Sequence, residues 1–278
     1  MWQENCKTIC LDKDQITFGE IHYRFSQTPA GKRLDTNVRW SRFQPSYISN
    51  PEWVKLIGYD ANNLEHGRLT YGLTVWFINH QNQSDLPTKF NSEEQAILKL
   101  TALTHDWPEG FTQKGDVNYE AKTSQDEQEE LSIITSAVIS SIGDSYESTE
   151  IAHQVKNCLE DTKSKLGQAF NCIEAIGYLR TALIVWPQSE KTQDHQLSQQ
   201  FKMLTNNVFY NSIPKLIHYS DQYYPARKFL LDRNQTIIQA FNMPESSFDG
   251  YGQDKPTKIN NFIAARETWN KWISTINS

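Results

Sequence analysis

The feature that most constrains this chain is the spacing of its apolar residues, which recur every three or four positions through most of residues 64–276. Such spacing places apolar side chains along one face of an α-helix, whereas a half-buried strand needs strict alternation. Alternating stretches are scarce, and no part of the chain has the pattern of strands and helices in turn. We therefore predict an all-α fold.

Capping residues and turn residues bound the expected helices. These helices cover residues 64–79, 92 to about 107, 124–142, 149–186 with a break near 161–164, 199–209, 228–241 and 259–276. Ser92 with Gln95, and Ser124 with Glu127, have the spacing of capping boxes. Pro187 is expected to stop the fourth helix, because proline lacks the N–H that continues a helix.

The distribution of turn residues and of helical spacing predicts that the chain has three parts. Turn residues and scattered aromatics fill residues 1–60, which we expect to form an irregular segment packed on the core. Residues 61–187 are expected to form the helical core, and residues 188–278 a helical extension. Aromatic residues make up 12% of the chain, which argues for a packed interior and against disorder.

Charge and composition exclude several classes of protein. The formal net charge is -6 and no basic patch appears, so we expect no nucleic-acid partner. No apolar run reaches the roughly 18 residues that a membrane helix needs, and the first residues lack a signal pattern. The four cysteines form no CxxC pair, which suits reduced thiols. We expect a cytoplasmic protein without a membrane partner. The acidic run Asp126–Glu130 is interpreted as a helix start, where the dipole favours negative charge.

The segment Thr104–Glu109 contains the adjacent pair His105-Asp106 at an expected helix end. Both side chains can reach one metal ion if the backbone turns there. An imidazole nitrogen together with a carboxylate oxygen suits divalent Mn, Fe, Co, Ni, Zn or Mg. A single His-Asp pair is more often an ordinary helix end, so the rest of the chain must supply the context.

That context is an ordered series of short motifs. They are, in chain order, Arg39-Trp40, Glu65-His66, His105-Asp106-x-x-Glu109, Gly115-Asp116 and Lys122. The series resembles the HD-domain phosphohydrolase superfamily, in particular its small 5′-nucleotidase-like members. The resemblance covers about residues 35–185, and the order of the motifs makes it more specific than any one of them.

The resemblance implies an HD-type helical bundle around a divalent metal ion. It also implies a metal-dependent phosphohydrolase acting on nucleotides or a related small phosphate ester. The metal ligands implied are His66, His105, Asp106 and Asn171. The partner implied is a small phosphorylated substrate, and a homodimer is kept open as the assembly.

The resemblance also implies catalytic roles. Glu109 is expected to orient the attacking water or to shuttle its proton. Asp116 is expected to protonate or position the leaving oxygen. Three cations are the expected phosphate ligands: Arg39, Arg68 and Lys122. Arginine suits this role better because its guanidinium can make two parallel contacts.

The chain departs from the family pattern at Asn171, where an aspartate is expected within Ala169–Ala175. An amide oxygen can bind a metal but brings no charge, so affinity should fall. Asp161 is the alternative fourth ligand. The departure keeps open a second function, a catalytically weakened HD-fold binding or regulatory module. A third option is an interaction protein that uses residues 190–278 as a partner-binding extension.

Overall fold

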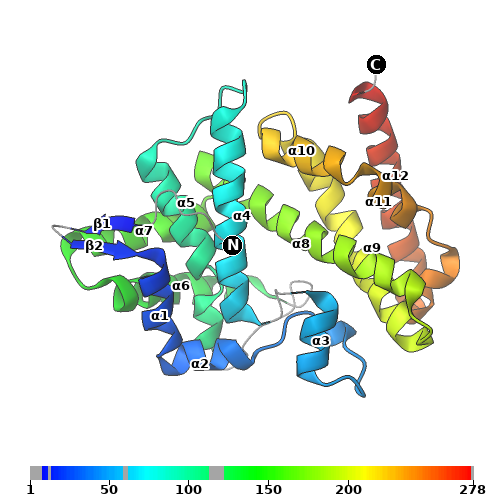
Figure 1. Cartoon of the computed structure of the whole chain (residues 1–278), viewed down its shortest axis with the longest axis horizontal. Helices are drawn as coiled ribbons and strands as arrows, with labels where there is room; N and C mark the ends of the chain where they lie inside the picture. Colours follow the sequence, from blue (N-terminus) through cyan, green and yellow to red (C-terminus); the bar gives the residue numbers. More distant parts are fainter. Residues whose placement is uncertain (1–7, 12–13, 59–61, 113–121, 277–278) are drawn as a thin grey trace. The chain divides into compact units, whose positions relative to one another are not determined.

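The computed structural model describes residues 8–11, 14–58, 62–112 and 122–276 (Figure 1). The fold is all-α, as predicted, with one two-stranded hairpin. The elements of the described residues are β1 (Thr8–Leu11), β2 (Asp14–Thr17), α1 (Phe18–Ser26), α2 (Pro29–Thr36), η1 (Ser41–Phe43), α3 (Asn50–Ile57), α4 (Asn63–Gln83), α5 (Ser92–Thr104), η2 (Trp107–Gly110), α6 (Ser124–Ile142), α7 (Tyr146–Glu160), α8 (Lys165–Lys191), α9 (His195–Tyr219), α10 (Tyr224–Asp232), α11 (Asn234–Phe241), η3 (Glu245–Asp254) and α12 (Lys255–Ile276), where η marks a 3-10 helix.

The expectation that residues 1–60 are irregular is wrong. Strands β1 and β2 pair antiparallel, and helices α1, α2 and α3 follow. Local signals explain the helices: the Thr17 side chain caps α1, and Thr28 caps α2 just before a proline. The buried residues Phe18, Ile21 and Phe25 have helical spacing. This signal was present in the sequence but spans only two turns.

The predicted helices from residue 63 onward are confirmed, except that the predicted helix 228–241 is two helices, α10 and α11, with Arg233 between them. The capping boxes lie one residue earlier than predicted, at Asn91 with Glu94 and at Thr123 with Asp126. Asn, Ser and Thr are all favoured N-cap residues, so the spacing alone did not distinguish between capping boxes one residue apart. The predicted break separates α7 from α8.

Pro187 does not stop its helix, because α8 continues to Lys191. The side-chain amide of Gln188 donates to the Ile184 carbonyl at 3.1 Å, and the Ser189 hydroxyl donates to the Trp186 carbonyl at 2.7 Å. Pro187 lacks the N–H that would donate to the Leu183 carbonyl, and these two side-chain bonds add donors at the neighbouring carbonyls of Ile184 and Trp186. Trp186 and Ser189 are buried, so packing also favours the continued helix.

The chain divides into two compact units. The first unit comprises Met1–Arg39, Tyr59–Asn79 and Phe90–Asn171, and the second comprises Trp40–Gly58, His80–Lys89 and Cys172–Ser278. The predicted domain boundaries at residues 60 and 187 stay a prediction.

The core of the first unit lies among α1, α2, α5, α6 and α7. Its buried members include Ile21, Phe25, Leu34, Leu100, Leu103, Trp107, Ile134, Val138, Ala152 and Val155. The rings of Phe25 and Trp107 stack at 3.8 Å between centroids and 3° between planes. A Cβ on Gly110 would lie 2.7 Å from the Ala30 carbonyl oxygen, so η2 lies against α2 without room for a side chain. These contacts anchor the segment that follows Asp106.

The second unit is built around aromatic side chains of α9, α11 and α12. Phe209, Phe241, Phe262 and Trp269 are buried and contact one another. Trp53 of α3 stacks on Phe201 of α9 at 5.8 Å. In the described part of the chain, no helix combines the length and the apolar composition that a membrane crossing requires.

Candidate metal centre

His66, His105 and Asp106 meet in the first unit. One potential ligand atom from each lies within 4.8 Å of those of the other two. Nε2 of His105 is 3.2 Å from Oδ1 of Asp106, and Nε2 of His66 is 3.9 Å from Oδ2 of Asp106. All three side chains are at most 13% exposed. The predicted convergence of these residues is confirmed, while metal binding itself stays a prediction.

A close approach of α4 and α5 brings the two histidines together. A Cβ on Gly67 would lie 2.5 Å from the carbonyl oxygen of Leu103, closer than real Cβ atoms come. Glycine is therefore required where α4 passes α5. As a result the His66 and His105 rings, each next to this crossing, lie 5.2 Å apart at 67°.

The end of α5 directs His105 and Asp106 to one point. The His105 N–H still donates to the Thr101 carbonyl at 2.9 Å, so this residue closes the last helical turn. Asp106 follows with φ -88° and ψ -4°, which turns the backbone before η2 begins. Two adjacent residues can thus face the same place because they lie on either side of a helix end.

Hydrogen bonds orient both imidazoles. Nδ1 of His105 lies 3.0 Å from the Ala102 carbonyl oxygen. A carbonyl only accepts, so Nδ1 carries a proton and Nε2 faces Asp106. If the ring is neutral, the lone pair of Nε2 then points at Oδ1 of Asp106, 3.2 Å away. That contact is favourable only with a proton or a cation between the two atoms. Nε2 of His66 is 3.3 Å from the Thr70 hydroxyl.

Arg39 reaches the same carboxylate. Its guanidinium donates to Oδ2 of Asp106 at 2.7 Å, and both side chains are mostly buried. A β-bridge between Val38 and Asn62 holds this segment beside the start of α4. One of the predicted phosphate-binding cations is therefore in direct contact with a predicted metal ligand.

Glu109 lies on η2 and is buried. Its Oε2 accepts a hydrogen bond from the Asn63 amide, and its Oε1 is 3.9 Å from Nζ of Lys122. Nζ of Lys122 is also 2.5 Å from Oε2 of Glu130 on α6. Burial lowers the pKa of Lys122, but Glu130, and at longer range Glu109 and Asp106, outweigh it, so the pKa is raised. Burial likewise raises the pKa of Glu130, against the opposing effect of Lys122.

Asn171 lies on α8, and its amide nitrogen donates to the Gly167 carbonyl at 3.0 Å. The preceding ring, that of Phe170, packs edge-on against His105 at 5.2 Å. Asp161 caps the turn between α7 and α8, where its Oδ1 accepts from the N–H groups of Lys163 and Ser164. Asp161 is therefore engaged in a local turn.

One other predicted residue, Arg68, does not lie at the centre. Arg68 is exposed on α4 and pairs with Glu65 at 3.0 Å. It follows His66 by two residues, which is about 200° around a helix, so the two side chains point to different sides. Asp116 lies outside the described residues.

Three residues near the centre were not predicted from the sequence: Asn63, Thr70 and Glu130. Asn63 and Thr70 are uncharged residues of α4, and no motif marks them. Glu130 belongs to the acidic run that was interpreted only as a helix start. Its contact with Lys122 is the signal that singles it out, and this contact is tertiary.

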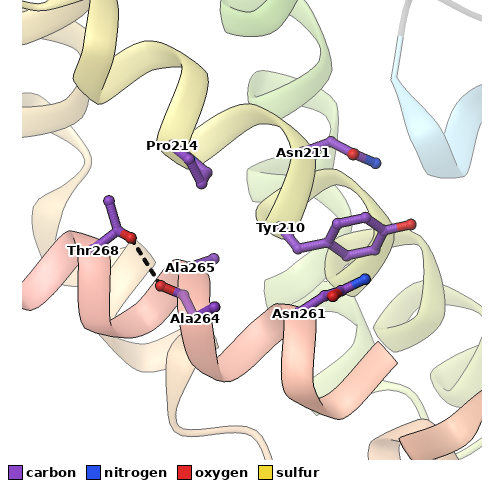
Figure 2. A pocket seen from close by; sticks show the side chains of 7 residues that line it. All are labelled: Tyr210, Asn211, Pro214, Asn261, Ala264, Ala265 and Thr268. Atoms are coloured by element: carbon purple, nitrogen blue, oxygen red, sulfur yellow. Dashed lines mark hydrogen bonds between the residues drawn. The ribbon is translucent and has the colours of Figure 1, made fainter. Parts of the chain in front are cut away.

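A depression of about 390 Å³ lies between α9 and α12 in the second unit (Figure 2). Its lining residues are neutral: Tyr210, Asn211, Pro214, Asn261, Ala264, Ala265 and Thr268. The Thr268 hydroxyl donates to the Ala264 carbonyl at 2.9 Å, a bond within its own helix. This lining supplies neither a charged group nor a strong metal ligand, so the metal centre remains the candidate site.

The described residues at the centre and beside it provide two imidazoles, three carboxylates (Asp106, Glu109 and Glu130) and two cations (Arg39 and Lys122). Such a set can bind a divalent ion and a phosphate group together. Comparison of the chain with the models of protein families, with curated proteins and with solved structures found no match.

Proposed function

We propose that this protein is a metal-dependent phosphohydrolase of the HD-domain type, acting on nucleotides or a related small phosphate ester. The observation that carries the proposal is the convergence of His66, His105 and Asp106 within 4.8 Å in a buried place. The ordered motifs that resemble HD-domain phosphohydrolases support the same assignment.

The donor set fits a divalent transition ion. Two imidazole nitrogens and one carboxylate oxygen suit Mn, Fe, Co, Ni or Zn, and Mg is the harder alternative. The tautomer of His105 fits as well, because Nε2 faces Oδ1 of Asp106 and both atoms could serve as ligands of a divalent ion. A divalent ion supplies Lewis acidity toward water and toward a phosphoryl oxygen.

The charges around the centre favour a bound cation before a bound phosphate. Three carboxylates, those of Asp106, Glu109 and Glu130, face two cations, Arg39 and Lys122. With these five groups of the described residues ionised, three negative and two positive charges leave -1. This balance repels a phosphate dianion. A divalent cation turns the sum to +1, which attracts it.

The chain's own residues then have distinct roles. Arg39 lies at the centre and binds the phosphate through its planar guanidinium. Glu109 orients the attacking water, held by the Asn63 amide. Asp116, outside the described residues, is assigned to the leaving oxygen by the resemblance alone. Arg68 faces another side of α4 and has no part in this proposal.

Metal content and turnover test the proposal together. The purified protein should contain a divalent transition ion by elemental analysis, at about one ion per chain or less. After reloading with each of Mn, Co, Fe, Ni, Zn and Mg, it should release inorganic phosphate or pyrophosphate from a panel of nucleoside mono- and triphosphates. Failure to bind any of these ions would sink the proposal.

Asn171 favours a second candidate, an HD-fold binding or regulatory module. Its amide already donates to the Gly167 carbonyl and brings no negative charge to the centre. Such a module would bind metal and nucleotide in equilibrium dialysis and release no phosphate during prolonged incubation. A cytoplasmic location and a homodimer stay predictions under either candidate.

A further inference from the structure

Four side chains form a continuous series beside the metal centre. Asn63 donates to Oε2 of Glu109, Oε1 of Glu109 lies 3.9 Å from Nζ of Lys122, and Nζ lies 2.5 Å from Oε2 of Glu130. The series joins α4 to α6 through η2. Its last member, Glu130, belongs to none of the motifs of the sequence.

We infer that Glu130 is a positioning residue that holds Lys122 beside Glu109 and keeps it from closing onto the Oε1 atom. The inference deepens the proposed function and rests on it, since Glu109 is the residue that orients the attacking water.

The two distances from Nζ of Lys122 distinguish its contact with Glu130 from its contact with Glu109. A separation of 2.5 Å is a full charge-assisted hydrogen bond, whereas 3.9 Å exceeds hydrogen-bond length. Lys122 is therefore bound to Glu130 and only attracted by Glu109. Its side chain is 19% exposed, so an ammonium at this place needs a carboxylate partner to offset its lost hydration.

The consequence concerns the geometry of Glu109. Asn63 holds Oε2, so Oε1 is the oxygen that faces Lys122. Without the charge of Glu130, the flexible lysine is still attracted by Glu109, whose Oε1 lies 3.9 Å from Nζ, and moves onto that oxygen. A salt-bridged Oε1 orients water poorly, so the loss of Glu130 should slow the chemical step.

The contact can be tested without any turnover. We expect Nζ of Lys122 to react several-fold faster with an acylating reagent in Glu130→Gln than in the wild type, because Glu109 alone of the two carboxylates, Glu130 and Glu109, then raises the pKa of the amine. Peptide mass spectrometry gives the rate, with the exposed Lys163 as internal reference. The matched control is Glu129→Gln, an exposed residue of the same helix, which should leave the rate unchanged. Equal rates in Glu130→Gln and Glu129→Gln would overturn the inference.

Kinetics test whether Glu130 acts through Lys122. On a nucleotide that the wild type hydrolyses, Glu130→Gln should lower kcat by about tenfold to a hundredfold, with a smaller change in KM. The double variant Glu130→Gln/Lys122→Met should match Lys122→Met alone. Additive losses would mean that Glu130 acts independently of Lys122, which contradicts the inference.

The two levels of failure can be told apart. A wild type that binds no metal and turns over no nucleotide refutes the proposed function, while the acylation rates still decide whether Glu130 holds Lys122. Circular dichroism of each variant checks folding. If Glu130→Gln does not fold, Glu130→Asp keeps the charge on a shorter side chain, and it should give an intermediate acylation rate. A wild-type rate in Glu130→Asp together with wild-type kcat would count against a positioning role.

Discussion

Gly67 of α4 lies so close to the Leu103 carbonyl of α5 that a Cβ at this position would be 2.5 Å from the oxygen. His66 precedes the glycine and His105 follows Leu103 by two residues. The distance between the two imidazoles therefore depends on a residue without a side chain. Any change that separates α4 from α5 also separates the candidate metal ligands.

Gly67→Ala should destabilise the protein and weaken its metal centre together. An added methyl group must push against backbone, so the free energy of unfolding should fall by about 1–3 kcal/mol. The control is Gly19→Ala on α1, where the nearest atom to a new Cβ is 3.9 Å away. That substitution should be neutral or slightly stabilising. Urea unfolding measures stability and isothermal titration measures metal affinity; unchanged values for Gly67→Ala would contradict the expected crowding.

His105→Ala and Asp106→Ala should each abolish stoichiometric metal binding while helical content stays near that of the wild type. Both residues follow the end of α5, so their loss removes ligands and little core volume. Asp106→Asn should also lower the free energy of unfolding by about 1.5–3 kcal/mol, because Arg39 loses its charged acceptor. The exposed His153 supplies the control His153→Ala. Elemental analysis and circular dichroism check these outcomes, and metal retained by both alanine variants would refute the centre.

Asn171→Asp should tighten divalent metal binding if this position supplies the fourth ligand. An anionic oxygen attracts a dication more strongly than an amide dipole does, and a tenfold gain corresponds to about 1.4 kcal/mol. Asn157→Asp on the exposed face of α7 adds the same charge away from the centre and should leave affinity unchanged. Titration calorimetry compares the two. Equal affinities would remove Asn171 from the ligand set, and tighter binding without turnover would favour the binding module.

The buried thiol of Cys158 should make stability depend on pH in the alkaline range. Burial raises its pKa to about 12, with a smaller opposing effect from Thr101. Because the pKa in the folded state lies above that of the unfolded chain, about 8.5, this contribution is complete below that value and is lost as pH rises. The free energy of unfolding should fall by up to about 1.4 kcal/mol per pH unit for this thiol.

Urea unfolding at pH 8, 9 and 10 under reducing conditions measures that slope. The burial of Cys172 raises its pKa too, so the wild type combines both thiols. Cys158→Ala removes one of them, and the difference in stability between variant and wild type should change steadily above about pH 9. A difference that stays constant with pH would show that Cys158 ionises as easily in the folded protein as in the unfolded chain.

Local sequence signals determined most of the helices. The spacing of Leu131, Ile134, Val138 and Ile142 predicts a helix that the structure places at Ser124–Ile142. Apolar spacing, caps and turns act within a few residues, so they can be read without knowing the fold. Their limits are equally local: the signal of α1 spans only two turns, and Pro187 does not end a helix that the surrounding packing supports.

The sequence by itself also determined which side chains belong to the candidate centre, because His66, His105 and Asp106 occur in an ordered series of motifs. Only the tertiary structure decided that Arg39 contacts Asp106 across 67 positions of the chain, that Arg68 faces another side, and that Glu130 holds Lys122. The physical reason is the difference in sequence separation between the two kinds of interaction. Helix spacing and capping depend on neighbours within one or two turns, whereas a contact between distant residues depends on how closely helices approach. At this centre, one glycine of α4 sets that approach.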